Sequence, residues 1–277
     1  MKKITTLLMV LAMVLSMCAC GSSSKVKVID IELTDEEYAF GVDKDQPELL
    51  TKTNAFIDEI MKNGKFEEIC NKYFGDGTPT AVTSKPFDAS KDQLVVATNA
   101  AFEPFEYTQG DKYYGIDMEI AAALAEYLGK ELVISNMNFD AVVLSVGQHK
   151  ADIAMAGLTV NEDRKEHVNF TTSYYKASQK LIVLEDNKDY NDCKTAADVE
   201  AIFAKKTTAK VGVQSGTTGQ FYCEGDEDWG FDGFKFTTVP YANGSLAIQA
   251  LINGNLDMVI IDAAPAECIT KSMNEVQ

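Results

Sequence analysis

The sequence predicts an α/β protein of two lobes, each with a central β-sheet flanked by helices, with a ligand cleft between the lobes. From residue 92 onward, short β-branched runs alternate with stretches whose apolar residues recur at helical spacing. This alternation is typical of βαβ units with a largely parallel sheet. It forms two blocks separated by an extended stretch near 175–184. Two such blocks favour a cleft at their boundary.

The elements of each block follow from local patterns. A strand is expected over 94–98, and a helix over 115–128, where apolar residues recur every three or four positions. Asn253-Gly254-Asn255 should stop a helix ahead of the last strand. The other expected strands are 131–135, 152–156, 210–213, 235–239 and 257–261, and the other expected helices are 139–147, 195–205, 217–223, 244–253 and 263–273.

The first nineteen residues are typical of a signal peptide. Two lysines precede an apolar run from Ile4 to Met17, which is too short to span a bilayer comfortably. Cys20 follows Ala19 and precedes a flexible Gly-Ser-Ser-Ser stretch. This pattern resembles the lipobox of bacterial lipoproteins, which implies lipid attachment at Cys20, a tether over 20–25 and a location at the outer face of the cell membrane. An ordinary signal peptide cut nearby is the alternative.

Charge and cysteine usage exclude several classes of function. The formal net charge of −17 repels phosphate backbones, so nucleic acid is not an expected partner. The acids are scattered and 46% of residues are hydrophobic, which indicates a folded globule. Cys70, Cys193, Cys223 and Cys268 form no CxxC pair and no Cys/His cluster, so neither a metal nor a cofactor is expected. A Cys193–Cys223 disulfide is left open.

Residues 26–91 do not fit the order of the two blocks. Strands are expected at 26–31 and 38–42, but no partner strand is near them in sequence. Helices are expected at 47–62 and 65–74. The stretch 75–91 holds turn-forming residues with little apolar content and is interpreted as a linker.

Several motifs occur in a recognisable order between residues 93 and 267. They are Ala97-Thr98-Asn99-Ala100-Ala101-Phe102-Glu103-Pro104-Phe105-Glu106-Tyr107, Gly115-Ile116-Asp117-Met118-Glu119-Ile120, Phe139-Asp140-Ala141, Ala151-Asp152-Ile153, residues 157–164 and 212–219, and Leu256-Asp257 through Asp262. Together they resemble family 3 of the bacterial extracellular solute-binding proteins, the polar amino-acid receptors of ABC importers. The resemblance implies a type II periplasmic-binding-protein fold, a free amino acid as ligand, the importer's membrane subunits as partners, and a monomer.

The N-terminal stretch resembles the C-terminal end of the same family. The matching segments are Val28-Ile29-Asp30-Ile31, Glu37-Tyr38-Ala39-Phe40-Gly41-Val42 and 64–75. The chain therefore resembles a circularly permuted member, whereas a truncated fusion that pairs with a second chain is the alternative. The expected division is 26–38 as a strand completing lobe 2, 39–74 as the C-terminal part of lobe 1, 75–91 as the linker, 92–180 as lobe 1 and 181–277 as lobe 2.

A free amino acid presents a carboxylate and an ammonium whose hydration must be replaced on burial. The resemblance implies that Arg164 holds the carboxylate, with Thr159 beside it; a guanidinium suits this role because it donates two parallel hydrogen bonds. The helix start at Gly216-Thr217-Thr218 should present backbone N–H groups to the same carboxylate. The ammonium is expected at Asp262, with the Thr159 hydroxyl and the Gly157 carbonyl completing its shell.

The side chain of the ligand is expected between two aromatic rings. The resemblance implies that Phe102 and Phe139 sandwich it and exclude water. Gln214 and Tyr241 are further candidates near it. Asn99 sits where basic-amino-acid receptors of this family place an acid, and its neutrality weakens an arginine or lysine prediction.

Each of these residues also has a structural interpretation. Arg164 alone would more often form a surface ion pair, with Glu162 or Glu166. Phe102 and Phe139 would more often be core residues, Asp262 could cap the following helix, and Gly216-Thr217-Thr218 could be a helix start only. His149 and His167 are expected at the surface.

Passive capture of an amino acid is the expected function. An enzyme on the same scaffold, similar to a cyclohexadienyl dehydratase, is the alternative, and Glu103 or Glu106 would be its acid/base candidates. Arg164 and Asp262 would form an amino-acid clamp without a spare catalytic pair, so no catalytic residue is assigned. A signalling module is a third hypothesis; no transmembrane segment is seen after residue 20, which argues against a receptor kinase.

Overall fold

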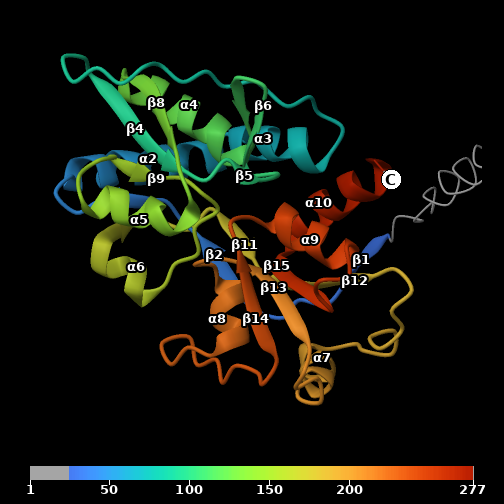
Figure 1. Ribbon diagram of the computed structural model, residues 1–277. Coiled ribbons are helices and arrows are strands. Elements are labelled where there is room, and N and C mark those ends of the chain that lie inside the picture. Colours follow the sequence, from blue (N-terminus) through green and yellow to red (C-terminus); the bar gives the residue numbers. More distant parts are fainter. Residues whose placement is uncertain (1–24, 277) are drawn as a thin grey trace, which may run out of the picture.

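The computed structural model describes residues 25–276, which form two α/β lobes (Figure 1). Each lobe has a five-stranded sheet flanked by helices. The expected signal peptide and Cys20 lie outside the described residues. Among residues 25–276, the helices lack the combination of length and apolar character needed to cross a bilayer.

Lobe 1, the upper lobe in Figure 1, is built on the sheet β10-β3-β9-β4-β8. β4 runs parallel to β8 and β9, whereas β3 runs antiparallel to both of its neighbours. A small sheet, β5-β6-β7, lies in the same lobe. The strands are β3 (Gly41–Asp43), β4 (Gln93–Thr98), β5 (Ala101–Phe102), β6 (Glu106–Gln109), β7 (Lys112–Tyr114), β8 (Glu131–Asn136), β9 (Ile153–Ala154) and β10 (Val168–Phe170). The helices are α2 (Pro47–Lys62), α3 (Lys65–Phe74), α4 (Ile116–Leu128), α5 (Phe139–Gly147) and α6 (Glu162–His167).

Lobe 2 is built on the sheet β1-β12-β15-β13-β14. β13 is parallel to β14 and β15, and β1 closes the other edge antiparallel to β12. The strands are β1 (Val26–Ile29), β12 (Gln179–Leu184), β13 (Lys210–Gln214), β14 (Thr237–Tyr241) and β15 (Met258–Asp262). The helices are α7 (Ala196–Phe203), α8 (Thr218–Glu224), α9 (Gly244–Ile252) and α10 (Ala263–Val276).

A two-stranded ladder joins the lobes. β2 (Glu36–Tyr38) pairs antiparallel with β11 (Tyr175–Ala177), and Figure 1 shows both strands in the middle of the molecule. Along β2 the side chains alternate, so that Glu36 and Tyr38 are buried on one face while Glu37 is exposed. Side chains of this ladder therefore lie in the region between the lobes.

The predicted fold class is confirmed, with local differences. The strand expected over 38–42 is interrupted, because the backbone N–H groups of Ala39 and Phe40 donate to Leu158 O and the Thr171 hydroxyl rather than to one continuous ladder. The strand expected over 235–239 begins at Thr237, the partner of Lys210 in the parallel pair. The small sheet over 101–114, α6 and β10 were not predicted.

The segment over 75–91 is bound to the surface of lobe 1. Val82 is buried, and it exchanges two backbone hydrogen bonds with Tyr113. Lys85 N donates to Leu132 O. Backbone pairing therefore holds this turn-rich stretch against β7 and β8.

The beginning of β1 lies against the last helix. Val26 N donates to Asn274 Oδ1 at 3.1 Å, and Asn274 Nδ2 donates to Val26 O at 2.8 Å. One side chain of α10 thus satisfies both backbone groups of the first residue of β1.

Candidate functional site

Arg164 is held in a buried position by α6 and both lobes. Asn161 caps α6, its Oδ1 accepting from Arg164 N at 2.8 Å. The guanidinium donates from Nη1 to Thr159 O at 2.6 Å and from Nη2 to Gly216 O at 3.0 Å. It also lies 5.2 Å from the centroid of the Phe139 ring. Arg164 therefore links the segments that the sequence assigned to the ligand carboxylate.

The surface ion-pair interpretation of Arg164 does not apply here. Its relative exposure is 8%, and Glu162 pairs with Lys165 instead, at 2.7 Å. Burial lowers the pKa of Arg164 to about 10, while the charges of Glu36 and Asp262 oppose that shift. The guanidinium thus remains charged at neutral pH.

Asp262 ends β15 as a buried carboxyl group. It accepts a hydrogen bond from the Tyr38 hydroxyl of β2. Burial, followed by the charge of Glu36, raises the pKa of Asp262 to about 7, and the Tyr38 hydrogen bond opposes this rise. An incoming ammonium would favour the ionised carboxylate.

Glu36 is a buried acid that the sequence analysis did not select. Its Oε2 accepts from the Thr159 hydroxyl at 2.8 Å, and its Oε1 accepts from Gln179 Nε2 at 3.0 Å and from the Thr34 hydroxyl at 2.6 Å. The segment was interpreted only as a strand completing lobe 2. Three consecutive acids in Asp-Glu-Glu-Tyr were the available signal, but nothing local shows which of them is buried.

The two lobes touch through polar side chains. Gln214 Nε2 donates to Asn99 Oδ1 at 3.2 Å, and Asn99 Nδ2 in turn donates to Met137 O at 2.8 Å. The Ser215 hydroxyl donates to Asp140 Oδ2 at 3.0 Å. Asn99 and Gln214, both expected near the ligand side chain, therefore contact each other across the lobe boundary.

Gly157 allows a close approach of backbone to ring. Its φ is +51°, and a Cβ there would lie 2.7 Å from the Phe102 ring. Its N–H donates to Asp117 Oδ2 at 2.9 Å, and the Tyr174 hydroxyl donates to Asp117 Oδ1 at 2.7 Å. Burial raises the pKa of Asp117 to about 7. The buried Asp117 side chain thus holds the loop that contains Gly157 in place.

The start of α8 contributes two buried threonines. Thr217 precedes the helix, but its hydroxyl donates back to Gln214 O at 2.9 Å and makes no cap hydrogen bond. Thr218 is the first residue of the helix and is buried. Tyr241, at the end of β14, pairs in register with Gln214 and is half-buried.

Glu106 is a fully buried acid. Both of its carboxylate oxygens lack a hydrogen-bond partner among residues 25–276. Burial, followed by the charges of Asp117 and Asp262, raises its pKa well above the usual value. Glu106 lies opposite Phe102 in the β5–β6 pair. Gln214 Oε1 is also buried and unpartnered within the described part of the chain.

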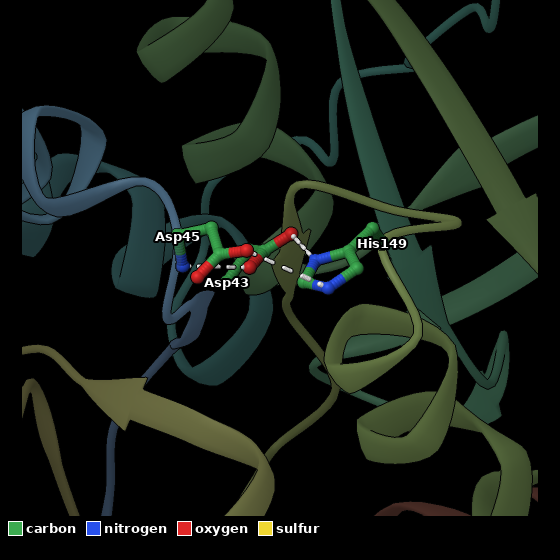
Figure 2. Close-up of side chains that lie close together, drawn as sticks. All are labelled: Asp43, Asp45 and His149. Carbon is green, nitrogen blue, oxygen red and sulfur yellow. Dashed lines mark hydrogen bonds and ion pairs between the residues drawn. The ribbon is translucent and has the colours of Figure 1, made fainter.

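The other acid near this hairpin and the histidines are more exposed. Glu103 is half-buried, and burial raises its pKa. His149 and His167 are both exposed. Figure 2 shows that the His149 ring faces two acids, Asp43 at the end of β3 and Asp45 just after it. Its Nδ1 is 2.8 Å from Asp43 Oδ2 and its Nε2 is 3.7 Å from Asp45 Oδ2. This cluster is an ion pair on lobe 1, and we assign no ligand to it.

One pocket reaches the predicted site. It has a volume of about 200 Å³ and is lined in part by Phe139, Arg164 and Gly216, from both lobes. A larger pocket, about 560 Å³, lies beside Tyr222 and the loop over 230–235. That pocket includes none of the predicted ligand residues, so the chemistry points to the smaller one.

Comparison with known proteins agrees with this geometry. Residues 94–221 match the family described as bacterial extracellular solute-binding proteins, family 3. The arginine-binding extracellular protein ArtP of Bacillus subtilis is 30% identical over 190 residues, which cover 69% of this chain and 69% of ArtP. The chain belongs to this family. Solute binding outside the cytoplasm is the role that family membership gives it.

Further members with similar sequences and structures are known. A probable histidine-binding protein of Neisseria gonorrhoeae is 30% identical over 61% of this chain and 58% of its own length. The holo form of ArgBP from T. maritima has a TM-score of 0.55 at 31% identity, covering 66% of this chain and 74% of ArgBP. The ancestral amino acid-binding protein AncCDT-1, described as a precursor of cyclohexadienyl dehydratase, has a TM-score of 0.55 at 26% identity, covering 78% of each chain. These neighbours have the type II fold that the sequence predicts.

Proposed function

We propose that this protein captures a free cationic amino acid, with arginine as the first candidate, between its lobes and delivers it to the membrane subunits of an ABC importer. Family membership supports solute capture. Relatives named as arginine-binding or histidine-binding support an amino acid with a basic side chain. The side chains of the site supply the physical argument.

The common part of an amino acid fits the residues around Arg164 and Asp262. Arg164 keeps further N–H groups after its two bonds to backbone carbonyls, and these can bind the ligand carboxylate. The buried Asp262 carboxylate, the Gly157 carbonyl and the Thr159 oxygen are acceptors for the ammonium. Phe139 already stacks on Arg164, so its ring can also cover the ligand.

The buried and unpartnered carboxylate of Glu106 is the reason that we propose a cationic ligand. A buried charge without partners is strongly unfavourable, so either a proton or a ligand cation must compensate it. Gln214 Oε1 adds a second buried acceptor without a partner. A guanidinium donates several N–H groups from one plane, which suits acceptors of both kinds. Asn99 is neutral, so in this proposal Glu106 takes the part of the acid.

Two ligands of nearly the same shape test the proposal. Citrulline replaces the guanidinium of arginine by a neutral ureido group. We expect isothermal titration of residues 21–277, after unfolding and refolding to remove bound ligand, to show arginine binding at least about tenfold more tightly, as expected for a charge-assisted hydrogen bond. A thermal-shift screen of the other amino acids is the companion experiment. Equal affinities for arginine and citrulline would contradict the cationic specificity.

Two substitutions test the site for the common part of the ligand. We expect Arg164→Ala and Asp262→Ala each to weaken binding by about 100-fold or more, because each leaves one ligand charge buried without a partner. Circular dichroism and the urea midpoint show whether the fold persists. Wild-type affinity in a folded variant would reject the assignment of that residue.

We infer that binding is the function rather than catalysis. The compared relatives are named as binding proteins, and AncCDT-1 is described as an amino acid-binding precursor of an enzyme. Glu103 and Glu106 are the acids that a dehydratase-like activity would require. Turnover of cyclohexadienyl acids by the purified protein would overturn this inference.

We also propose that Cys20 carries the lipid that holds the protein at the outer face of the membrane. The Ala-Cys-Gly-Ser context supports this attachment. Expression with radiolabelled palmitate is the test. Cys20→Ala should abolish incorporation of the label and release the protein from the membrane fraction, whereas Cys18→Ala should change neither.

The segment order supports a circular permutation. β1 pairs with β12 of lobe 2, β3 pairs with β9 and β10 of lobe 1, and Val26 hydrogen-bonds with Asn274. A rewired chain, with 75–277 followed by 26–74, tests it and keeps the segment that is bound to lobe 1. We expect this chain to fold and to bind the same amino acid within about twofold. An unfolded or non-binding product would favour the alternative of a fusion that needs a second chain.

A further inference from the structure

Two buried side chains of β2 contact residues of different lobes. The Tyr38 hydroxyl donates to Asp262 of lobe 2, and the Glu36 carboxylate accepts from the Thr159 hydroxyl of lobe 1 at 2.8 Å. Glu36 is only 2% exposed. The strand that joins the lobes therefore contacts two of the residues that the proposed function assigns to the ligand ammonium, Asp262 and Thr159.

The contact with Glu36 fixes what the Thr159 hydroxyl can do. A hydroxyl has one proton to donate and two lone pairs to accept with. The Thr159 hydroxyl donates to Glu36 Oε2 at 2.8 Å, so its one proton points toward Glu36. The lone pairs of Thr159 Oγ1 then remain for the ligand. In this orientation the oxygen can accept from an ammonium but cannot donate to a carboxylate.

Other donors hold the Glu36 carboxylate in place. Thr34 and Gln179 Nε2 both donate to Oε1, which leaves Oε2 for Thr159. Gln179 also lies opposite Asp262 in the β12–β15 pair. The carboxylate is therefore oriented by groups outside the ligand site and passes that orientation to Thr159.

We propose that Glu36 is a positioning residue that makes the site selective for a ligand amino group by fixing the Thr159 hydroxyl as an acceptor. The inference rests on the proposed function, because it assumes that an amino acid binds at Thr159 and Asp262. Glu36 itself touches protein groups and acts on the ligand through Thr159. Its loss should change discrimination between ligands more than it changes the fold.

The measured quantity is the ratio of two dissociation constants, for L-arginine and for argininic acid, whose α-hydroxyl replaces the ammonium. Isothermal titration gives both for the wild type, Glu36→Gln, Thr159→Val and the double variant. An amide at position 36 presents an N–H beside Thr159 and allows its hydroxyl to reverse. We expect each single variant to reduce the wild-type preference for arginine by about tenfold, and the double variant to reduce it no further than Thr159→Val alone.

A matched control removes a different hydroxyl from the same carboxylate. Thr34→Val deletes one of the two donors to Oε1. Gln179 Nε2 still holds that oxygen and the Thr159 bond to Oε2 is intact, so the ratio should remain within about twofold of wild type. Thr34→Val and Thr159→Val decide the matter if Glu36→Gln does not fold: a ratio lowered equally by these two variants overturns the proposal.

The remaining outcomes separate the inference from the function. If wild-type protein binds arginine but Glu36→Gln leaves the ratio unchanged, the inference is wrong and the proposed function stands. If the effects of Glu36→Gln and Thr159→Val multiply in the double variant, Glu36 acts independently of Thr159, which also refutes it. If no amino acid binds to the folded wild type, the proposed function fails and the inference fails with it.

Discussion

Replacing Glu106 by glutamine should make the empty protein more stable and a poorer binder at the same time. The carboxylate is buried with two unpartnered oxygens and lies near the charges of Asp117 and Asp262. In the folded protein its pKa is raised, so ionisation above the unfolded pKa of about 4.3 opposes folding. The destabilisation grows as pH rises from there toward the folded pKa. An amide at this position cannot ionise.

The amide is as buried as the acid, so the gain comes from removing the ionisation of Glu106. Above the unfolded pKa this ionisation costs about 1.4 kcal/mol per pH unit until the folded pKa is reached, so the gain is on the order of 1 to 3 kcal/mol. A protein of this size shifts in Tm by about 3 °C per kcal/mol, which gives an increase of about 3 to 9 °C for Glu106→Gln near pH 8. At about pH 4 the difference should disappear, because Glu106 is then protonated in both states. Arginine affinity should fall by about tenfold or more, since the ligand cation loses its counter-charge.

Calorimetry of ligand-free protein at both pH values, combined with titration of arginine, measures both effects. Glu103→Gln is the matched control, because it makes the same chemical change on a half-buried acid close by in the chain. We expect the control to leave arginine affinity within about twofold. A Glu106→Gln variant that is less stable than wild type at pH 8 and binds arginine equally well would refute the reasoning.

Two further predictions concern other parts of the fold. Gly157→Ala should weaken ligand binding and lower the free energy of unfolding by about 2 kcal/mol or more, because its Cβ would lie 2.7 Å from Phe102. Gly254→Ala is the control, since Gly254 has a similar positive φ but no atom within 4 Å of the added Cβ. For this control, urea unfolding should show a loss of only about 1 kcal/mol, and titration should show no loss of affinity. Asp43 raises the pKa of His149 through a hydrogen bond, so the pair stabilises the fold below the unfolded histidine pKa of about 6.5 and the effect is lost as pH rises through the folded value. His149→Ala should therefore lower the urea midpoint at about pH 5.5 but not at about pH 9, and a pH-independent loss would contradict this.

The sequence predicted the elements well because their patterns are local. The helix over 116–128 and the strand over 93–98 each contain their own periodic apolar residues. The small sheet over 101–114 was missed, since its strands are short and two-residue β5 has no pattern of its own. Strand limits shifted where a partner strand, such as β13 for β14, decides the register.

The site was predictable only where a motif carried it. Arg164 and Asp262 were selected by resemblance, and both are buried where the lobes meet. Glu36 and Tyr38 were not, because their partners are remote: Tyr38 and Asp262 are 224 positions apart. Glu106 was considered only as a catalytic acid, since a sequence does not reveal that a carboxylate lacks hydrogen-bond partners.

The position of β1 has a consequence for the order in which the molecule can assemble. Lobe 1 is drawn from one continuous stretch, from β3 to β10, whereas the sheet of lobe 2 needs both β1 and the strands after residue 178. During synthesis and export, the upstream lobe is complete as soon as β10 has emerged, so it can fold first. β1 must wait, unpaired, for the arrival of β12. Assembly of the second lobe is therefore the late step.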